Sequence, residues 1–194
     1  MEDGTVIVHD DEIVNPNGSS SGWNKSITKV ENNKAYVGED LFANIQTEKI
    51  KDGEYMFFQS NLTTFTSDLS SLTNADSMFN QSRNLTTFNS DLSSLRDGSA
   101  MFLSCNKLTT FTSDLSSLTY GYKMFQSCAF RDFHITLASL IDGHGMFDGC
   151  SKLESFARDL SSLTNGYEMF DSCSNLKTFK SDLSSLTNGY RMFY

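Results

Sequence analysis

The feature that most constrains this chain is a Met-Phe dipeptide that returns at nearly constant intervals. Successive copies lie 22 or 23 residues apart, and they begin at Met56, Met78, Met101, Met124, Met146, Met169 and Met192. A period of this length is too short for a two-helix repeat, but it suits a leucine-rich-repeat coil with one short strand. The spacing therefore predicts a stack of similar coils.

One unit, residues 101–123, indicates how such a coil is built. Its segment at 108–113 is rich in β-forming residues. Because side chains alternate along a strand, Phe111 turns to one face while Thr110 and Thr112 turn to the other. We therefore expect an inward column of phenylalanines and an outward column of threonines.

The start of the next unit adds a second element. Met124, Phe125 and Cys128 stand at i, i+1 and i+4, a spacing that predicts one face of a short helix or 3₁₀ turn. A single coil buries too little apolar surface to fold alone, whereas stacked coils bury each other's faces. The predicted fold class is a repeat solenoid, mainly β with short helical turns. We expect a right-handed, leucine-rich-repeat-like solenoid of about seven coils of 22–23 residues.

Residues 108–114 and 121–128, which read LTTFTSD and GYKMFQSC, resemble the BspA-type leucine-rich repeat. They are most similar to the Met-Phe and Asp-Leu-Ser-Ser variant of bacterial surface proteins and phages. The resemblance covers roughly residues 50–194. It implies a non-enzymatic binding solenoid of the kind often used for adhesion. Asp114 and its equivalents stand where the family usually has Pro, and no secretion signal is visible.

The period predicts three parts. Residues 1–22 read as an N-terminal strand, at 5–8, and a flexible Gly/Ser linker, at 15–22. Residues 23–55 read as a degenerate capping coil, and residues 56–194 as the leucine-rich-repeat-like solenoid. The sequence stops in mid-repeat at Tyr194, so we expect the protein to continue beyond this residue.

Charge and composition limit the partners. Fifteen Lys and Arg against 24 Asp and Glu give a net charge of −9, which disfavours nucleic acid and anionic membranes. No apolar run is long enough for a transmembrane helix, so we expect no membrane insertion. Only three histidines are present, without a meaningful Ser-His-Asp spacing. We therefore expect no enzyme, no catalytic residues and no cofactor or metal.

Two repeat positions hold candidate metal ligands. Four cysteines share one position: Cys105, Cys128, Cys150 and Cys173. A linear column cannot form a tetrahedral zinc site, and we interpret them as free buried fillers. A second column contains Asp68, Asp91, Asp114, Asp159 and Asp182, which would cap local turns or bind calcium. Turn capping is the interpretation that we prefer. The acidic cluster from His9 to Glu12 reads as an exposed strand end rather than a metal site.

The candidate binding residues follow the outward strand positions and one turn. They are Thr64, Thr66, Thr87, Asn89, Thr110, Thr112, Asp132, His134, Thr178 and Lys180 on the strands, with Tyr122, Tyr167 and Tyr190 at the turn. The strand positions are either a binding surface or a solvated β face. The tyrosines either form an interface or pack over neighbouring turns. The coil at 128–136 departs most from the repeat, through either specificity or ordinary drift.

The predicted function is adhesion or recognition of a protein or glycan on a cell surface, through the solenoid surface. The alternative is a structural or host-recognition protein of a phage virion, whose partners are other virion proteins. The missing signal favours a virion, and the family resemblance favours a cell surface. Both locations are favoured over the cytoplasm. Ice binding by the Thr array is a distant alternative, because Asp132, His134, Ser155 and Ala157 interrupt the array.

Overall fold

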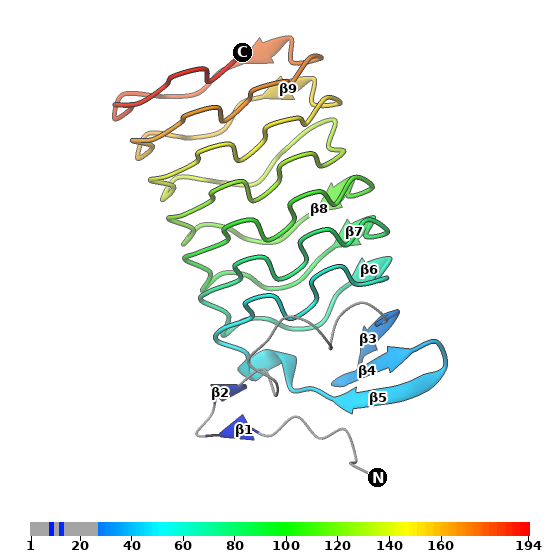
Figure 1. Ribbon diagram of the computed structural model, residues 1–194. Coiled ribbons are helices and arrows are strands. Elements are labelled where there is room, and N and C mark those ends of the chain that lie inside the picture. The colour runs from blue at the N-terminus through cyan, green and yellow to red at the C-terminus, as the bar shows by residue number, and fades with distance from the viewer. Residues whose placement is uncertain (1–7, 10–11, 14–26) are drawn as a thin grey trace.

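The computed structural model describes residues 8–9, 12–13 and 27–194. Figure 1 shows the repeat region as a stack of similar coils, with its short strands at one edge. These strands are β6 (Thr64–Phe65), β7 (Thr87–Phe88), β8 (Thr110–Phe111), β9 (Ser155–Phe156) and β10 (Thr178–Phe179). Strands β6, β7 and β8 form one parallel sheet, and β9 and β10 form another.

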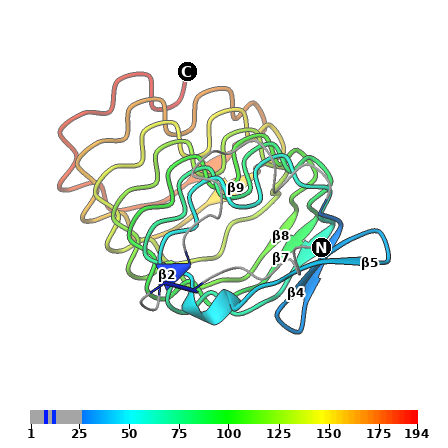
Figure 2. The same ribbon diagram turned by 60° about the horizontal axis from the view of Figure 1, so that its bottom comes forward.

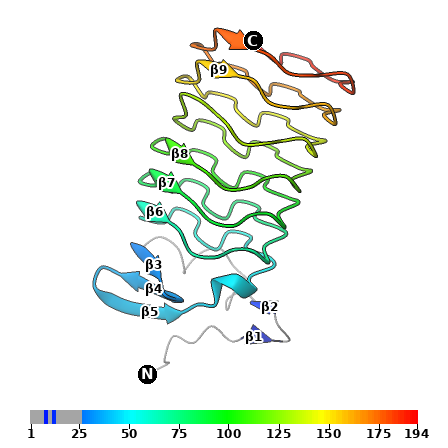
Figure 3. The ribbon, with the colours of Figure 1, turned by 180° about the vertical axis from the view of Figure 1, so that it is seen from behind.

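Equivalent residues of successive units lie directly beside one another. Thr64 pairs with Thr87, and Thr87 pairs with Thr110. A second series of parallel bridges joins the turns, from Asp52 with Asn74 to Asn165 with Asn188. Figure 3 shows the stack from behind. Paired residues of neighbouring coils are therefore one repeat length apart in the sequence. Residues at the same position of successive repeats form a column along the stack.

Two columns of phenylalanine rings fill the core. One contains the Phe of each Met-Phe pair, with neighbouring rings stacked 5.2 to 5.6 Å apart: Phe57, Phe79, Phe102, Phe125, Phe147, Phe170 and Phe193. The other contains the strand phenylalanines Phe65, Phe88, Phe111, Phe133, Phe156 and Phe179. Rings of the two columns meet edge to face, as Phe88 and Phe102 do at 4.8 Å. This arrangement explains the high phenylalanine content.

The strand ladder is interrupted in the coil that departs most from the repeat. At that level Asp132 forms only an isolated bridge to Ser155, so β8 and β9 belong to separate sheets. The Phe133 ring lies 6.3 Å from Phe111 and 6.3 Å from Phe156, farther than other neighbours in its column. Phe130, an extra buried ring, contacts Phe133 at 5.7 Å and occupies part of the core there.

The expected short helical turn after each glycine is wrong. Within 56–194 no helix forms, and the one 3₁₀ helix of the described residues is η1 (Thr47–Lys49). Alternate N–H groups close four-residue turns, as Met124 N–H does to the Gly121 oxygen. The N–H groups between them donate to the next coil, as Phe125 N–H does to the Met146 oxygen. Half of the donors are used between coils, and a helix would need all of them within its own segment.

The N-terminal part of the described chain is an antiparallel sheet rather than the predicted degenerate coil. Its strands are β3 (Lys29–Glu31), β4 (Lys34–Val37) and β5 (Asp40–Asn44). Figure 2 shows this sheet at the first end of the stack. Ile27, Val30 and Ile50 join the core of the repeats, and the N–H of Asn61 donates to the Ile27 oxygen at 3.0 Å. The sheet thus covers the apolar face of the first coil.

Ahead of this sheet, β1 (Val8–His9) and β2 (Glu12–Ile13) form a short antiparallel pair, with His9 opposite Glu12. The predicted linker at 15–22 and most of the predicted strand at 5–8 lie outside the described residues. A search of the described residues finds no helix with the length and apolar character to cross a membrane.

Candidate functional site

The outward strand positions lie along one edge of the stack, here named the strand edge. Phe65, Phe88 and Phe111 are buried between them. The predicted residues Thr64, Thr66, Asn89, Thr110, Thr112, Asp132, His134, Thr178 and Lys180 are exposed, and Thr87 is half-buried. The register aligns Thr64 with Thr110 in one sheet and Ser155 with Thr178 in the other. The edge is therefore divided in two at Asp132 and His134.

A polar pocket lies on the second half of the strand edge. It has a volume of about 740 Å³ and is lined by Ala157, Arg158, Asp159, Ser161, Lys180, Ser181 and Asp182. In two of the lining residues a polar atom, Nε of Arg158 and Oγ of Ser181, is buried in the protein and has no hydrogen-bond partner. The pocket thus combines cationic donors with carboxylate and hydroxyl acceptors. Its size falls within the range of small-molecule sites.

Arg158 was not singled out in the sequence, although a signal was present. It occupies the position of Ser90 and Ser113 in the regular coils. Its guanidinium reaches the neighbouring coil, where Nη1 donates to the His134 oxygen at 3.3 Å and Nη2 lies 3.3 Å from His134 Nδ1. Sequence reasoning could have found it as the one Arg in a column otherwise occupied by Ser and Ile135.

Basic side chains gather on the same half of the edge. Glu154 pairs with Arg131 at 3.2 Å and with Lys177 at 3.6 Å, and all three side chains are largely exposed. Exposed pairs of this kind contribute little to stability. Lys152 and Lys180 add two more exposed positive charges nearby. A chain of net charge −9 therefore presents a locally mixed, partly basic surface here.

A second pocket marks the beginning of the strand edge. It measures about 520 Å³ and lies between the N-terminal sheet and the first coil. Residues 28–31 with Gly38 and Glu39 line one side, and Thr63, Thr64 and Thr66 line the other. Both pockets therefore include predicted strand-edge residues.

The aspartate column caps turns, as the preferred interpretation held. In each case a carboxylate oxygen accepts the N–H of the serine two residues later, at 2.7 to 2.9 Å: Asp68, Asp91, Asp114, Asp159 and Asp182. These bonds lower the pKa of Asp91 and Asp159, because hydrogen bonds from Ser93 and Ser161 favour the charged carboxylate. No group of three or more metal-ligating side chains is found among the described residues.

The cysteine column is buried and free of disulfides. The thiol of Cys128 donates to the Phe102 oxygen of the preceding coil at 3.4 Å, and Ser82 Oγ donates to the Phe57 oxygen at 3.0 Å in the same way. Burial raises the pKa of Cys105 to about 12. Because the thiolate is the reactive form, these cysteines are chemically inert fillers at neutral pH.

The predicted turn tyrosines lie on the opposite edge of the stack, here named the turn edge. Tyr122 contacts His144 at 4.9 Å, His144 contacts Tyr167 at 4.6 Å, and Tyr167 stacks on Tyr190 at 5.6 Å. The rings thus pack on one another along the stack. Tyr122 and Tyr190 remain exposed, and Tyr167 is half-buried. The structure does not bring these tyrosines together with the strand edge.

The comparisons with known proteins agree with this architecture. The family described as BspA type leucine rich repeat region matches residues 43–154 and 121–194, with six copies of its repeat. No curated protein and no solved structure matches the chain. Because the two matched segments together span more than half of its residues, the chain belongs to the BspA-type leucine-rich repeat family.

Proposed function

We propose that this chain is a recognition module that binds a protein or a glycan through the strand edge. Repeats of its family are generally non-enzymatic scaffolds for protein binding. The wider proposal includes a right-handed solenoid of about seven coils, which the repeat-length offsets of the parallel bridges support.

One observation carries the proposal. Exposed hydroxyl and amide side chains are held in register along the edge, and they lead to a pocket lined by Arg158 and Lys180 as donors and by Asp159 and Asp182 as acceptors. Glycan hydroxyls or the backbone and polar side chains of a protein would supply the matching groups.

The setting of this recognition is a cell surface or a phage virion. The binding chemistry is the same in both, since a virion protein also meets its host through an exposed surface. Mass spectrometry of purified phage particles distinguishes the two, because a virion protein is recovered with the particles. Ice binding is disfavoured, because Asp132 and His134 interrupt the Thr columns and the two strand sheets are separate.

The test compares ligand binding by matched variants on a glycan array and on a phage-displayed library of random 12-residue peptides. Arg158→Ala/Lys180→Ala and Thr110→Ala/Thr112→Ala remove strand-edge groups. Lys51→Ala/Arg96→Ala removes two exposed cations from the turn edge and serves as the charge-matched control. We expect at least tenfold weaker binding for a strand-edge variant and unchanged binding for the control. Equal affinities for all variants would refute the proposal.

A further inference from the structure

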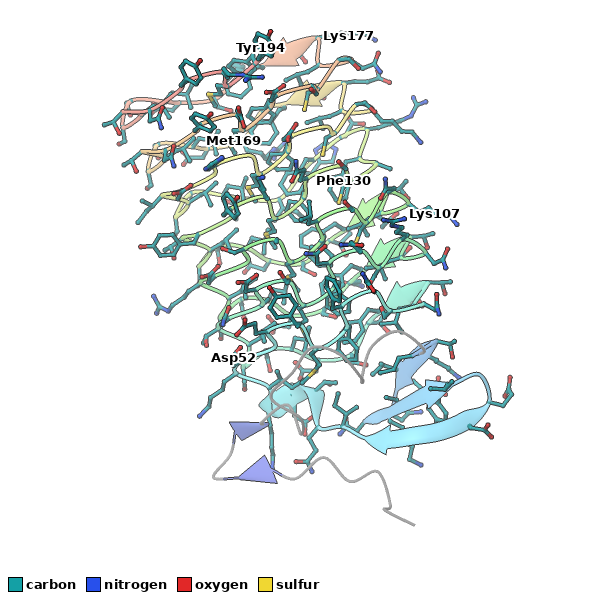
Figure 4. All side chains as sticks on the ribbon, in the orientation of Figure 1. Asp52, Lys107, Phe130, Met169, Lys177 and Tyr194 are labelled. Carbon is teal, nitrogen blue, oxygen red and sulfur yellow. The ribbon has the colours of Figure 1, made fainter. Side chains whose placement is uncertain are left out.

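The turn edge carries an apolar patch that the strand-edge function does not use. The large hydrophobic side chains that are exposed in the described residues are Tyr120, Tyr122, Ile141, Tyr190, Phe193 and Tyr194. The first four occupy turn-edge columns and are 51%, 40%, 40% and 64% exposed. In Figure 4, Asp52, which shares the Tyr120 column, lies across the stack from Lys107 and Lys177.

Tyr120 replaces a residue that caps its turn in the other coils. In that column Asp52, Asn74, Asp97, Asp142, Asn165 and Asn188 each accept the N–H of the residue two positions later, at 2.9 to 3.2 Å. A phenol cannot fold back to accept that N–H as a short Asx side chain does. Tyr120 therefore lacks the hydrogen bond that stabilises this turn in the other coils. Because its side chain is 51% exposed, burial of the ring offsets little of that loss.

Ile141, one coil farther on, likewise lacks a hydrogen bond that other coils make and exposes an apolar side chain. In its column Thr73, Thr119, Thr164 and Thr187 donate their hydroxyls to a carbonyl of the preceding coil, at 2.9 to 3.1 Å. Lys51 and Arg96 fill the remaining positions with exposed charges, so Ile141 is the apolar member of the column. Ile141 has no hydroxyl, and its side chain faces solvent. Two neighbouring coils thus lose a local hydrogen bond and gain exposed apolar surface. Departures of this kind mark residues retained for something other than stability.

The adjoining column changes chemistry at the same level of the stack. The residue after the turn glycine, or after Ala75, is Glu54, Asp76 and Ser99 in the early coils. It becomes Tyr122, His144, Tyr167 and Tyr190 in the later ones, where the rings touch in sequence. The turn edge is therefore polar and acidic at its start and aromatic where Tyr120 and Ile141 stand.

We propose that this turn-edge patch, made of Tyr120, Tyr122, Ile141, His144, Tyr167 and Tyr190, binds a short apolar segment of a partner protein. Exposed tyrosines are typical of protein interfaces, and Lys123 Nζ lies 5.3 Å from the centre of the Tyr122 ring at the border of the patch. The polar groups beside the rings are already occupied: Asp142 accepts from His144 N–H and Asn165 Nδ2, and Asn165 Oδ1 accepts from Asn188 Nδ2. Glycan hydroxyls would find few free partners there, whereas apolar side chains need none.

The size of the patch favours a segment over a second copy of the chain. Coils lie about 5 Å apart, so the rings from Tyr122 to Tyr190 extend over about 15 Å. An extended peptide of about five residues covers that length. A standard dimer buries about 800 Å² on each partner, far more than one column of rings offers. A net charge of −9 on each copy also opposes self-association.

The test uses Tyr120→Asn/Ile141→Thr, which restores the residue types of the regular coils. Because it restores two structural hydrogen bonds, we expect a melting temperature a few degrees above wild type. Peptides selected on the wild-type protein from a phage-displayed library of random 12-residue peptides are then measured by fluorescence anisotropy. We expect apolar peptides whose affinity falls at least tenfold in this variant. Their affinity should stay within twofold in the strand-edge variant Thr110→Ala/Thr112→Ala.

Other outcomes overturn the proposal. A lower melting temperature for the double variant would make Tyr120 and Ile141 structural residues. Selected peptides that bind wild type and variant equally would leave the patch without its ligand. A wild-type dimer that becomes monomeric in the variant, by sedimentation, would make a second copy the occupant. Patch-dependent signals on a glycan array, without patch-dependent peptides, would make it a sugar site. Failure of the strand-edge proposal changes none of these readouts, since it concerns other variants.

Discussion

The buried cysteine column should make the folded protein sensitive to alkali. Burial raises the pKa of Cys105 and of Cys173 from the ordinary 9.0 to about 12, and it raises the pKa of Cys128 and Cys150 well above 9.0. An unfolded thiol ionises near its ordinary pKa. As the pH rises through this window, the unfolded state releases protons that the folded state retains. The free energy of unfolding is therefore unaffected by the thiols below pH 9 and falls above it.

The size of the effect follows from the number of thiols. Each one lowers the free energy of unfolding by about 1.4 kcal/mol per pH unit between its unfolded and folded pKa values. At pH 10.5 this gives about 2 kcal/mol each for Cys105 and Cys173, or about 4 kcal/mol together. Cys128 and Cys150 act in the same direction. The loss is a large fraction of the 5–15 kcal/mol that stabilises typical folded domains.

The assay is urea unfolding followed by circular dichroism at pH 7.5 and pH 10.5, under reducing conditions. The matched control replaces all four cysteines by serine, a residue that Ser60 and Ser82 already provide in this column. Exposed Lys and Tyr ionise alike in both proteins, so the difference between them isolates the thiols. We expect the wild type to lose at least about 4 kcal/mol more than the control. An equal loss in both proteins would refute the burial argument.

Four further predictions concern stability and are checked by urea or thermal unfolding. Ser127 has a φ of +61°, a conformation that costs a non-glycine residue about 1–2 kcal/mol. Glycine avoids this strain but loses more backbone entropy on folding, so Ser127→Gly should raise the free energy of unfolding by about 0.5–1 kcal/mol. Gly149 has a φ of +68°, and an added Cβ would lie 3.1 Å from Ser127 Oγ. Gly149→Ala should therefore lower the free energy of unfolding by about 1 kcal/mol or more. Phe125→Ala removes a ring with five aromatic neighbours and should cost about 3–5 kcal/mol, whereas Phe193→Ala, at a side chain 52% exposed, should cost much less. Asp114→Ala should cost about 1 kcal/mol through the lost turn bond, Asp114→Asn should retain it, and millimolar calcium should leave the melting temperature unchanged.

Much of the fold was predictable because the repeat length of the sequence, 22 or 23 residues, is also the offset between paired residues of neighbouring coils. Once Phe111 was assigned to the inside, the ring columns and the outward Thr110 followed from alternation along a strand. The turn after each glycine was not predictable in this way. The spacing from Met124 to Cys128 fits a helical face, and it contains no information about N–H groups that donate to the next coil.

The N-terminal sheet did leave a signal that the period obscured. Asn32 and Asn33 both have positive φ, 48° and 58°, and they connect β3 to β4. Two consecutive residues of this type between β-forming stretches favour a tight hairpin turn. The pocket at Arg158 could not be predicted to the same extent. Its lining comes from two coils, and only their relative placement reveals that Arg158 and Ser181 line one pocket.

In a repeat protein, an unusual residue can be compared directly with the residues at the same position of the other repeats. Ser82 in the cysteine column retains the hydrogen bond to the preceding coil, so the exchange is neutral for the stack and needs no functional explanation. Tyr120 lacks the turn bond that the other six residues of its column make, and Ile141 lacks the hydroxyl bond that the four threonines of its column make. Arg158 leaves a buried nitrogen unpaired. All three stand in the coils from residue 101 onward, on both edges. Because stacked coils contact only their neighbours, costs of this kind stay local and the early, regular coils can sustain them. Recognition is therefore expected to depend on the coils from residue 101 onward, while the first two coils supply rigid support.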